Sequence, residues 1–147
     1  MITFKKHELP LLEEFLGGVE LYRAASRGRN RLLTLLEQKR EEVMEEEQDI
    51  MKQYAEYDED GNVKTKRVER EDGQPGIYVV FKSDEANVSF MQEMQELSLE
   101  DCSISIEEYL PLMEALLTGL DEYDKPLSGN QAYLYDLLCT QLEENLG

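Results

Sequence analysis

Residues 9–20 read Leu9-Pro10-Leu11-Leu12-Glu13-Glu14-Phe15-Leu16-Gly17-Gly18-Val19-Glu20, and this stretch decides the fold because it recurs near the other end of the chain. The second occurrence is Leu110-Pro111-Leu112-Met113-Glu114-Ala115-Leu116-Leu117-Thr118-Gly119-Leu120-Asp121. At an offset of 101, six of the twelve positions are identical, namely Leu9/Leu110, Pro10/Pro111, Leu11/Leu112, Glu13/Glu114, Leu16/Leu117 and Gly18/Gly119. The sequence therefore predicts that one structural unit occurs twice.

The similarity continues beyond this stretch. At an offset of 102, residues 26–36 fall on residues 128–138, and Glu41-Glu42 falls on Glu143-Glu144. A chance resemblance is the alternative, because a proline in the first helical turn followed by leucines at helical spacing begins many buried helices. Two segments that agree in the same order favour the duplication of one helix–turn–helix unit.

These patterns predict a predominantly helical α+β fold. We expect two similar helix–turn–helix hairpins at residues 9–56 and 109–146, together with one extra helix at residues 84–97. A small antiparallel sheet is predicted from residues 2–5, 63–69, 76–82 and 102–106. The length of 147 residues favours a single domain, 1–147, in which the copies 1–56 and 102–147 flank a hairpin-plus-helix insert at 57–101.

Proline and glycine set the expected boundaries of the first copy. Pro10 keeps the residue before it extended, so the first helix is expected to begin about there. Gly17-Gly18 would weaken a helix interior by about 1 kcal/mol per glycine, so we expect a close helix crossing at this pair, as at the matching Gly119. A turn is predicted at Gly28, and a long helix follows it over residues 30–55.

The long helix has a thin apolar stripe in its second half. Leu36, Val43 and Ile50 are spaced by sevens, but few other apolar residues accompany the last two. The outer half of this helix could project and form a narrow coiled-coil contact with a second copy of the chain. A solvated helix packed on the following hairpin is the alternative.

The segment after the long helix contains turn signals. Asp58-Glu59-Asp60-Gly61-Asn62 resembles part of a calcium loop, but Arg67 stands where that loop needs a bidentate glutamate, so we predict a polar turn. The Asp72-Gly73 pair then joins the two predicted strands of the insert as a hairpin.

A helix is predicted after this hairpin, with Ser83 as its N-terminal cap. Its apolar residues Val88, Met91 and Met94 are expected to face the protein interior, with Phe90 and Leu97 as further candidates, since methionine usually serves as core filling.

Charge is the strongest compositional signal, with a formal net charge of -18. Residues 83–147 contain 15 acidic residues and one basic residue, whereas residues 1–82 contain 18 and 14. Such a field repels nucleic acids and anionic membranes and favours basic partners. We therefore expect neither a nucleic-acid partner nor a membrane partner.

Motifs for catalysis, cofactors and metals were sought without success. His7 is the single histidine, and no nucleophile signature accompanies it. The glutamates of the long helix lack the histidine partners of a carboxylate-bridged metal centre. Nucleotide-binding and Cys-x-x-Cys patterns are missing, and Cys102 and Cys139 are expected to be buried free thiols. We predict no catalytic residue, no cofactor and no metal, although chance carboxylate pairs leave acid–base chemistry open.

The candidate interaction surface consists of charged positions at the start and in the middle of the long helix. It comprises Glu41, Glu42, Glu45, Glu46, Asp49, Arg27, Arg29 and Arg31. The arginines are expected to neutralise carboxylates of the same chain or of a second copy, so a homo-oligomer is one prediction.

Several short motifs are similar to those of a family of short proteins from tailed phages and prophages of Gram-positive bacteria, whose function is not established. The residues that carry the resemblance are Ile2-Thr3-Phe4-Lys5, His7-Glu8-Leu9-Pro10-Leu11-Leu12, Phe15-Leu16, Ser26-Arg27, Asp58-Glu59-Asp60-Gly61, Leu127-Ser128-Gly129, Tyr135-Asp136 and Leu138-Cys139. The resemblance covers nearly the whole chain. It implies a phage origin and assigns no catalytic residue.

Together these observations favour a non-enzymatic phage or prophage protein that binds an unknown phage or host protein, in particle assembly or as a host-directed accessory factor. We expect it in the host cytoplasm, with association with the virion left open. The alternative is an acidic inhibitor that imitates DNA and blocks a host restriction or CRISPR nuclease, because carboxylates can take the place of phosphates. An enzyme that uses carboxylates and a bound metal is a third hypothesis.

Overall fold

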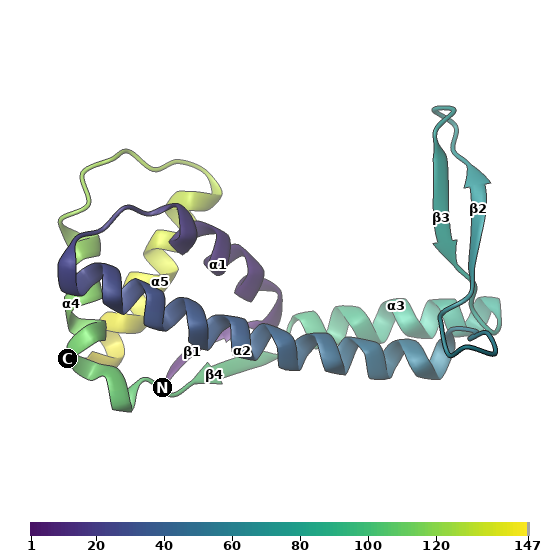
Figure 1. Ribbon diagram of the computed structural model, residues 1–147, viewed down its shortest axis with the longest axis horizontal. Coiled ribbons are helices and arrows are strands. Elements are labelled where there is room, and N and C mark those ends of the chain that lie inside the picture. The colour runs from purple at the N-terminus through teal and green to yellow at the C-terminus, as the bar shows by residue number, and fades with distance from the viewer. Residues whose placement is uncertain (147) are drawn as a thin grey trace. The chain divides into compact units, whose positions relative to one another are not determined.

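The computed structural model describes residues 1–146. Its elements are β1 (Ile2–Lys5), the 3-10 turn η1 (Lys6–Glu8), α1 (Leu9–Gly18), α2 (Arg23–Tyr54), β2 (Thr65–Glu69), β3 (Pro75–Val79), α3 (Asp84–Ser98), β4 (Asp101–Ile104), the 3-10 turn η2 (Glu107–Tyr109), α4 (Leu110–Asp121) and α5 (Asn130–Leu146), as Figure 1 shows. The predicted class, predominantly helical α+β, is confirmed. The contacts divide the chain into unit 1, Met1–Val43 with Leu99–Gly147, and unit 2, Met44–Ser98.

The two strands of unit 1 come from distant parts of the sequence and lie side by side (Figure 1). β1 pairs antiparallel with β4, and Ile2 lies opposite Ile104. Side chains alternate across a strand, so Ile2, Phe4 and Ile104 are buried on one face. On the other face, the Thr3 and Ser103 hydroxyls are hydrogen-bonded at 2.9 Å.

Both short helices of unit 1 begin beside a proline, as predicted, but the residue before Pro10 is not extended, since Leu9 has helical dihedral angles (φ -57°, ψ -50°) and is the first residue of α1. Pro10 and Pro111 each stand in the first turn, where a missing N–H costs nothing because that group has no partner inside the helix. The apolar side chains that follow at helical spacing form the core. They are Leu9, Leu12, Phe15 and Leu16 of α1 and Met113, Leu116 and Leu120 of α4.

Helices α2 and α4 cross closely because two small residues face each other. A Cβ atom at Gly119 would lie 2.5 Å from the Cβ of Ala25, and one at Gly28 would collide with the carbonyl oxygen of Leu112. The close crossing predicted at Gly119 is therefore present. Gly28, however, lies inside α2, so the predicted turn there is wrong and the long helix begins at Arg23 rather than near residue 30.

The close crossing predicted at Gly17-Gly18 is also wrong. α1 ends at Gly18, and a Cβ atom at either glycine would meet nothing within 4 Å. The two glycines stand where the helix terminates, so they contribute to the end of α1 rather than to packing.

Glu8 is a buried carboxylate that joins the start of α1 to α5. One of its oxygens accepts a hydrogen bond from the backbone N–H of Lys5 at 2.7 Å, and the other accepts one from the Tyr133 hydroxyl at 2.9 Å. The hydrogen bond to Glu8 raises the pKa of Tyr133. This satisfied carboxylate fixes the entry of the first helix.

The order of elements in unit 1 is compatible with the predicted duplication. A strand, a 3-10 turn and two helices occur twice, and equivalent strands pair antiparallel, as a two-fold relation requires. Leu32 and Leu36 of α2 are buried, and so are their counterparts Leu134 and Leu138 of α5. The second helices differ in length, 32 residues against 17. The duplication stays a prediction.

Unit 2 contains the last part of α2, the β2–β3 hairpin and α3. The backbone N–H of Lys82 donates to the carbonyl of Tyr54 at 2.9 Å, and Phe81 stacks on Phe90 with ring centroids 5.0 Å apart. A hydrogen bond to the Glu93 carboxylate raises the pKa of Tyr54. The polar turn predicted after the helix is present, since Asp58 accepts hydrogen bonds from the N–H groups of Asp60 and Asn62.

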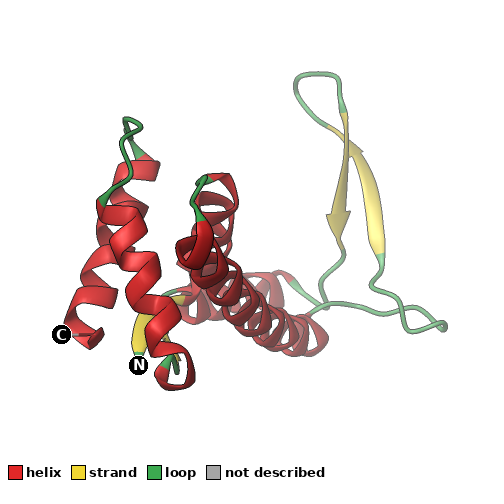
Figure 2. Ribbon diagram, turned by 60° about the vertical axis from the view of Figure 1, so that its left-hand side comes forward, coloured by secondary structure: helices red, strands yellow, loops and turns green. Residues whose placement is uncertain are grey.

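The strands form two separate sheets rather than the single small sheet expected from sequence. β1 pairs with β4 and β2 pairs with β3, so each sheet has two strands (Figure 2). The predicted strand positions are otherwise close to those observed. Periodicity marks residues as strands but does not say which strands pair, and this is why the single sheet was predicted wrongly.

The helix expected at residues 84–97 is present as α3, and its cap is as predicted. The Ser83 hydroxyl accepts a hydrogen bond from the N–H of Ala86 at 3.0 Å. The expected inner face is right in part: Leu97 is buried, and Phe90 and Met94 are half-buried. Val88 and Met91, which were expected inside, are 66% and 64% exposed.

Candidate functional site

The β2–β3 hairpin is the most exposed regular element of unit 2. Its turn is built as the sequence predicts: Gly73 has a φ of +80°, and the N–H of Gln74 donates to the Asp72 carboxylate at 2.9 Å. Every residue of β2 is exposed. A two-stranded hairpin without a covered face is only marginally stable in water.

One face of the hairpin combines basic and apolar side chains. The register places Lys66 opposite Tyr78 and Val68 opposite Gly76, so these residues share a face. A Cβ atom at Gly76 would lie 2.9 Å from both the Arg70 guanidinium and the Tyr78 ring. The two side chains therefore lie over Gly76, where only a glycine leaves room for them.

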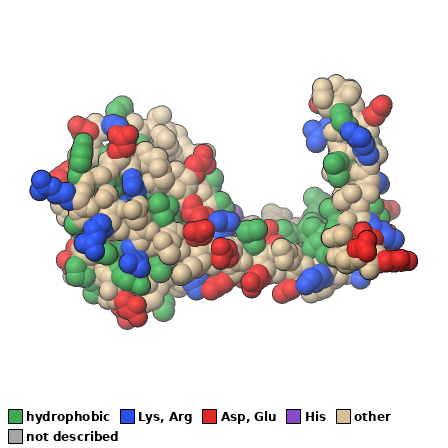
Figure 3. Space-filling model, viewed as in Figure 1, with side chains coloured by type: hydrophobic (Ala, Val, Ile, Leu, Met, Phe, Trp, Pro, Cys, Tyr) green, Lys and Arg blue, Asp and Glu red, His purple; other side chains and the backbone are tan. Residues whose placement is uncertain are grey.

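This face borders a hollow of about 530 Å³ that reaches the start of α3. We call it the hairpin hollow, and its lining includes Lys66, Val68, Tyr78, Phe81, Asp84 and Asn87. Hydrophobic side chains gather over unit 2 near the base of the hairpin (Figure 3). The lining of the hollow therefore mixes apolar side chains with polar ones, and it includes both a lysine and an aspartate.

Exposed apolar residues of α3 extend the same surface. Val88 follows Asp84 by four residues and Met91 follows Asn87 by four, so both lie on the helix face that lines the hairpin hollow. A single exposed apolar side chain needs no explanation, but a contiguous group of them marks an interaction site. The hairpin hollow, Val88 and Met91 together form the first candidate site.

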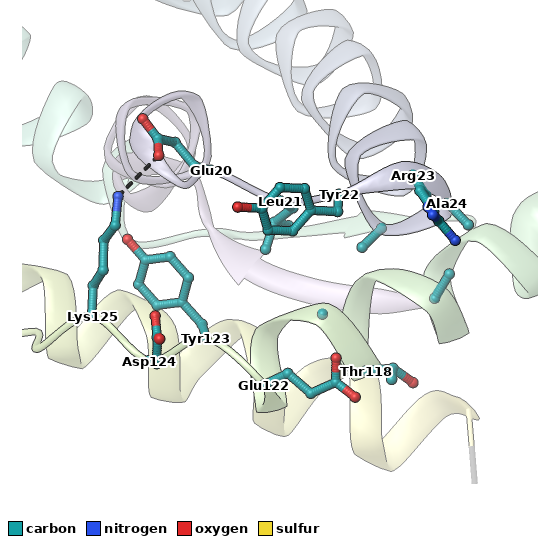
Figure 4. A pocket seen from close by; sticks show the side chains of 13 residues that line it. Glu20, Leu21, Tyr22, Arg23, Ala24, Thr118, Glu122, Tyr123, Asp124 and Lys125 are labelled. Atoms are coloured by element: carbon teal, nitrogen blue, oxygen red, sulfur yellow. Dashed lines mark hydrogen bonds and ion pairs between the residues drawn. The ribbon is translucent and has the colours of Figure 1, made fainter.

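Unit 1 contains a second pocket of about 530 Å³, between the α1–α2 connection and the end of α4 (Figure 4). Glu20 and Lys125 form an ion pair of 3.0 Å across it. The hydrogen bond from Lys125 lowers the pKa of Glu20, and the same bond raises the pKa of Lys125. Both side chains are exposed, so this pair contributes little to stability.

The lining of the unit 1 pocket mixes small residues with charged ones. Ala25 and Gly119, which form the helix crossing, also line the pocket, and Tyr22 beside them is 86% exposed. Figure 4 shows Tyr123 beside the ion pair. Besides the small residues, the lining contains carboxylates, tyrosine and threonine hydroxyls and the Lys125 ammonium, groups that can hydrogen-bond a polar ligand.

The predicted arginines make contacts that differ from those expected. Arg29 donates a hydrogen bond to the backbone carbonyl of Val19, and the Arg31 guanidinium lies 4.7 Å from the centroid of the Tyr109 ring. Arg27 and Arg31 line a shallow hollow of about 310 Å³. The guanidinium of Arg29 also donates to the side-chain oxygen of Asn30 at 3.4 Å, so within residues 1–146 the contacts of Arg29 and Arg31 are with carbonyl oxygens and an aromatic ring rather than with carboxylates.

The predicted glutamates occupy a different part of α2. Glu41, Glu42, Glu45 and Asp49 are exposed, whereas Glu46 is half-buried. The Lys39 ammonium and the Glu42 carboxylate form an ion pair of 3.3 Å. Arg31 precedes Glu41 by ten residues, or about 15 Å along a helix, so the structure does not bring the two groups together.

Sequence reasoning missed the hairpin hollow for an identifiable reason. Val68, Tyr78, Val88 and Met91 were taken as strand or core residues, because apolar residues at these spacings usually face an interior. The available signal was that Val68 stands between Lys66 and Arg70 on the same side of the strand, and two cations on one side are typical of a solvated strand face.

The described part of the chain was also searched for metal and membrane sites. Among residues 1–146, no group of three or more His, Cys, Asp and Glu side chains is arranged to hold a metal ion. None of the described helices is both long enough and apolar enough to span a bilayer. Cys102 and Cys139 are buried and are not joined in a disulfide.

Comparisons with protein-family models, with curated proteins and with solved structures found no match to this chain. The candidate site is therefore argued from its own residues.

Proposed function

We propose that the protein is a non-enzymatic phage or prophage protein that binds a phage or host protein through unit 2. The observation that carries the proposal is the exposure of apolar side chains on the α3 face beside the hairpin hollow, where Val88 is 66% and Met91 64% exposed. Covering such side chains contributes about 25 cal/mol per Å² of apolar area. The phage origin rests on the sequence resemblance alone.

Charge supports one kind of partner. Lys66 borders the hollow on the strand side and Asp84 on the helix side, so a partner surface with an apolar centre and charges of both signs at its rim would match it. This is the usual composition of a protein interface, with an apolar core and a polar rim.

The test is affinity capture from lysogenic or infected cells with a matched pair of variants. Val88→Asp with Met91→Asp places two charges on the exposed apolar positions of α3. Gln92→Asp with Gln95→Asp adds the same charge at exposed polar positions of the same helix. We expect the first variant to lose a partner that the wild type and the second variant retain. Equal recovery by all three proteins would remove the proposal.

A second candidate is the DNA-imitating inhibitor. The observation that favours it is the exposure of Glu41, Glu42, Glu45 and Asp49 along α2. Titration of the protein into DNA cleavage assays with several host nucleases tests it, and charge reversal of these four residues should relieve any inhibition. Unchanged cleavage at excess protein would end this candidate.

A further inference from the structure

The outer edge of β2 is an unpaired strand edge. In an antiparallel pair, residues alternate between positions that hydrogen-bond to the partner strand and positions that point away from it. The N–H of Arg70 donates to Gln74 and the N–H of Val80 donates to Lys64, each at 2.9 Å, so the even-numbered residues of β2 bond to β3. Thr65, Arg67 and Glu69 therefore direct their N–H and C=O groups outward.

The outer edge of β3 is less suited to pairing. It begins at Pro75, which has no N–H to donate. β2 has no proline, and all its side chains are exposed, so its edge is accessible over the whole strand. An uncovered edge templates the addition of another strand unless the charges along it repel that strand, so the charges of β2 decide what it can pair with.

The charges of β2 select one way in which it can pair with a second copy of itself. A two-fold axis perpendicular to the sheet places one residue opposite its own copy. At four positions that residue would be charged and would face a like charge: Lys66, Arg67, Glu69 and Arg70. An axis at Thr65 would put Lys66 opposite Lys64 of the second copy and would form no ion pair within the strand. An axis at Val68 also opposes two cations, Lys66 and Arg70, but it alone places Arg67 opposite Glu69.

We propose that β2 pairs antiparallel with β2 of a second copy of this chain, centred on Val68, to form a four-stranded sheet. Arg67 then lies opposite Glu69 of the second copy at an outward, hydrogen-bonding position, and the two-fold gives this ion pair twice. Val68, which is 42% exposed in the single chain, meets its own copy at the centre.

The balance of terms makes this a weak, concentration-dependent association. The two Arg67–Glu69 pairs favour the association, whereas the two oppositions of Lys66 and Arg70 weaken it by a comparable amount. The outward groups add about four backbone hydrogen bonds. A contact of one strand per chain falls below about 1,200 Å², the range of transient interfaces.

Disulfide cross-linking at the two-fold tests the register. Opposed residues at non-hydrogen-bonded antiparallel positions have Cα atoms about 4.5 Å apart, a distance that a disulfide spans. Val68→Cys should therefore form a covalent dimer under mild oxidation. Ile77→Cys is the matched control, because Ile77 is more exposed, at 73%, but lies on β3. Wild type gives the background from the two buried cysteines.

Charge reversal in the Val68→Cys background completes the test. We expect Arg67→Glu to reduce cross-linking several-fold and the double change Arg67→Glu with Glu69→Arg to restore it. The inference is overturned if Val68→Cys links no better than Ile77→Cys, if Arg67→Glu has no effect, or if the double change fails to restore the dimer. These variants leave α3 unaltered, so self-pairing and the proposed function can fail separately.

Discussion

Replacing Gly28 with alanine should destabilise unit 1, although alanine is the better helix former. A Cβ atom at this position would collide with the Leu112 carbonyl oxygen and lie 3.0 Å from the Cβ of Leu116. Neither atom can move away by a side-chain rotation, so α2 and α4 would have to separate. Overpacking of this kind costs about 1–3 kcal/mol, and sometimes more.

The net effect follows from two opposing terms. The alanine returns about 1 kcal/mol of helix propensity, which leaves a net loss of up to about 2 kcal/mol in the free energy of unfolding. At about 2–4 °C per kcal/mol for a chain of this size, a loss of about 2 kcal/mol lowers Tm by roughly 4–8 °C. Urea and thermal unfolding followed by far-UV circular dichroism measure both quantities.

Gly17 provides the matched control. It lies in α1, and a Cβ atom there would meet nothing within 4 Å. Gly17→Ala should therefore raise the free energy of unfolding by about 0.5 kcal/mol through helix propensity alone. The same substitution thus has opposite signs at the two glycines. A Gly28→Ala variant as stable as Gly17→Ala would refute the close crossing of α2 and α4.

Three further predictions concern polar groups of unit 1. Glu8→Ala should cost about 1–3 kcal/mol, because it removes a buried carboxylate and leaves the N–H of Lys5 and the hydroxyl of Tyr133 without their acceptor. Tyr133→Phe should cost less, because Tyr133 is 58% exposed, and urea unfolding separates the two. The pKa of Tyr133 is raised in the folded protein, so the contribution of Tyr133 to stability should be fully present below pH 10 and should decline as the pH rises through the folded pKa. Unfolding curves at successive pH values measure this loss. Tyr133→Phe should make it smaller. Burial raises the pKa of Cys139 to about 11. Alkylation of this thiol at pH 8 should therefore be slow in the folded protein and fast in urea. Fast labelling of the folded protein would contradict the buried position of Cys139.

The sequence predicts those parts of the fold that depend on local signals. Pro10 and Pro111 begin their helices because proline fits the first turn, and Ser83 caps α3 because its hydroxyl accepts a backbone N–H. The turn at Gly73 follows from its positive φ, which glycine adopts without strain. Each of these rules concerns residues within a few positions of one another.

The errors arose where distant segments decide the outcome. Gly28 looks like a turn residue, but it is small because α4 passes over it. Val88 and Met91 have the spacing of an inner helix face, but unit 2 has little to cover them, so they remain exposed. Spacing alone does not say which partner an apolar side chain meets, and for this reason the hairpin hollow was not predicted.

Hydrogen–deuterium exchange of the protein alone and with its captured partner tests the central claim most directly. The account predicts slower exchange in peptides that cover the hairpin and α3, residues 65–98, with little change in α1 and α4. Protection confined to unit 1, with exchange in residues 65–98 unaltered by the partner, would contradict it.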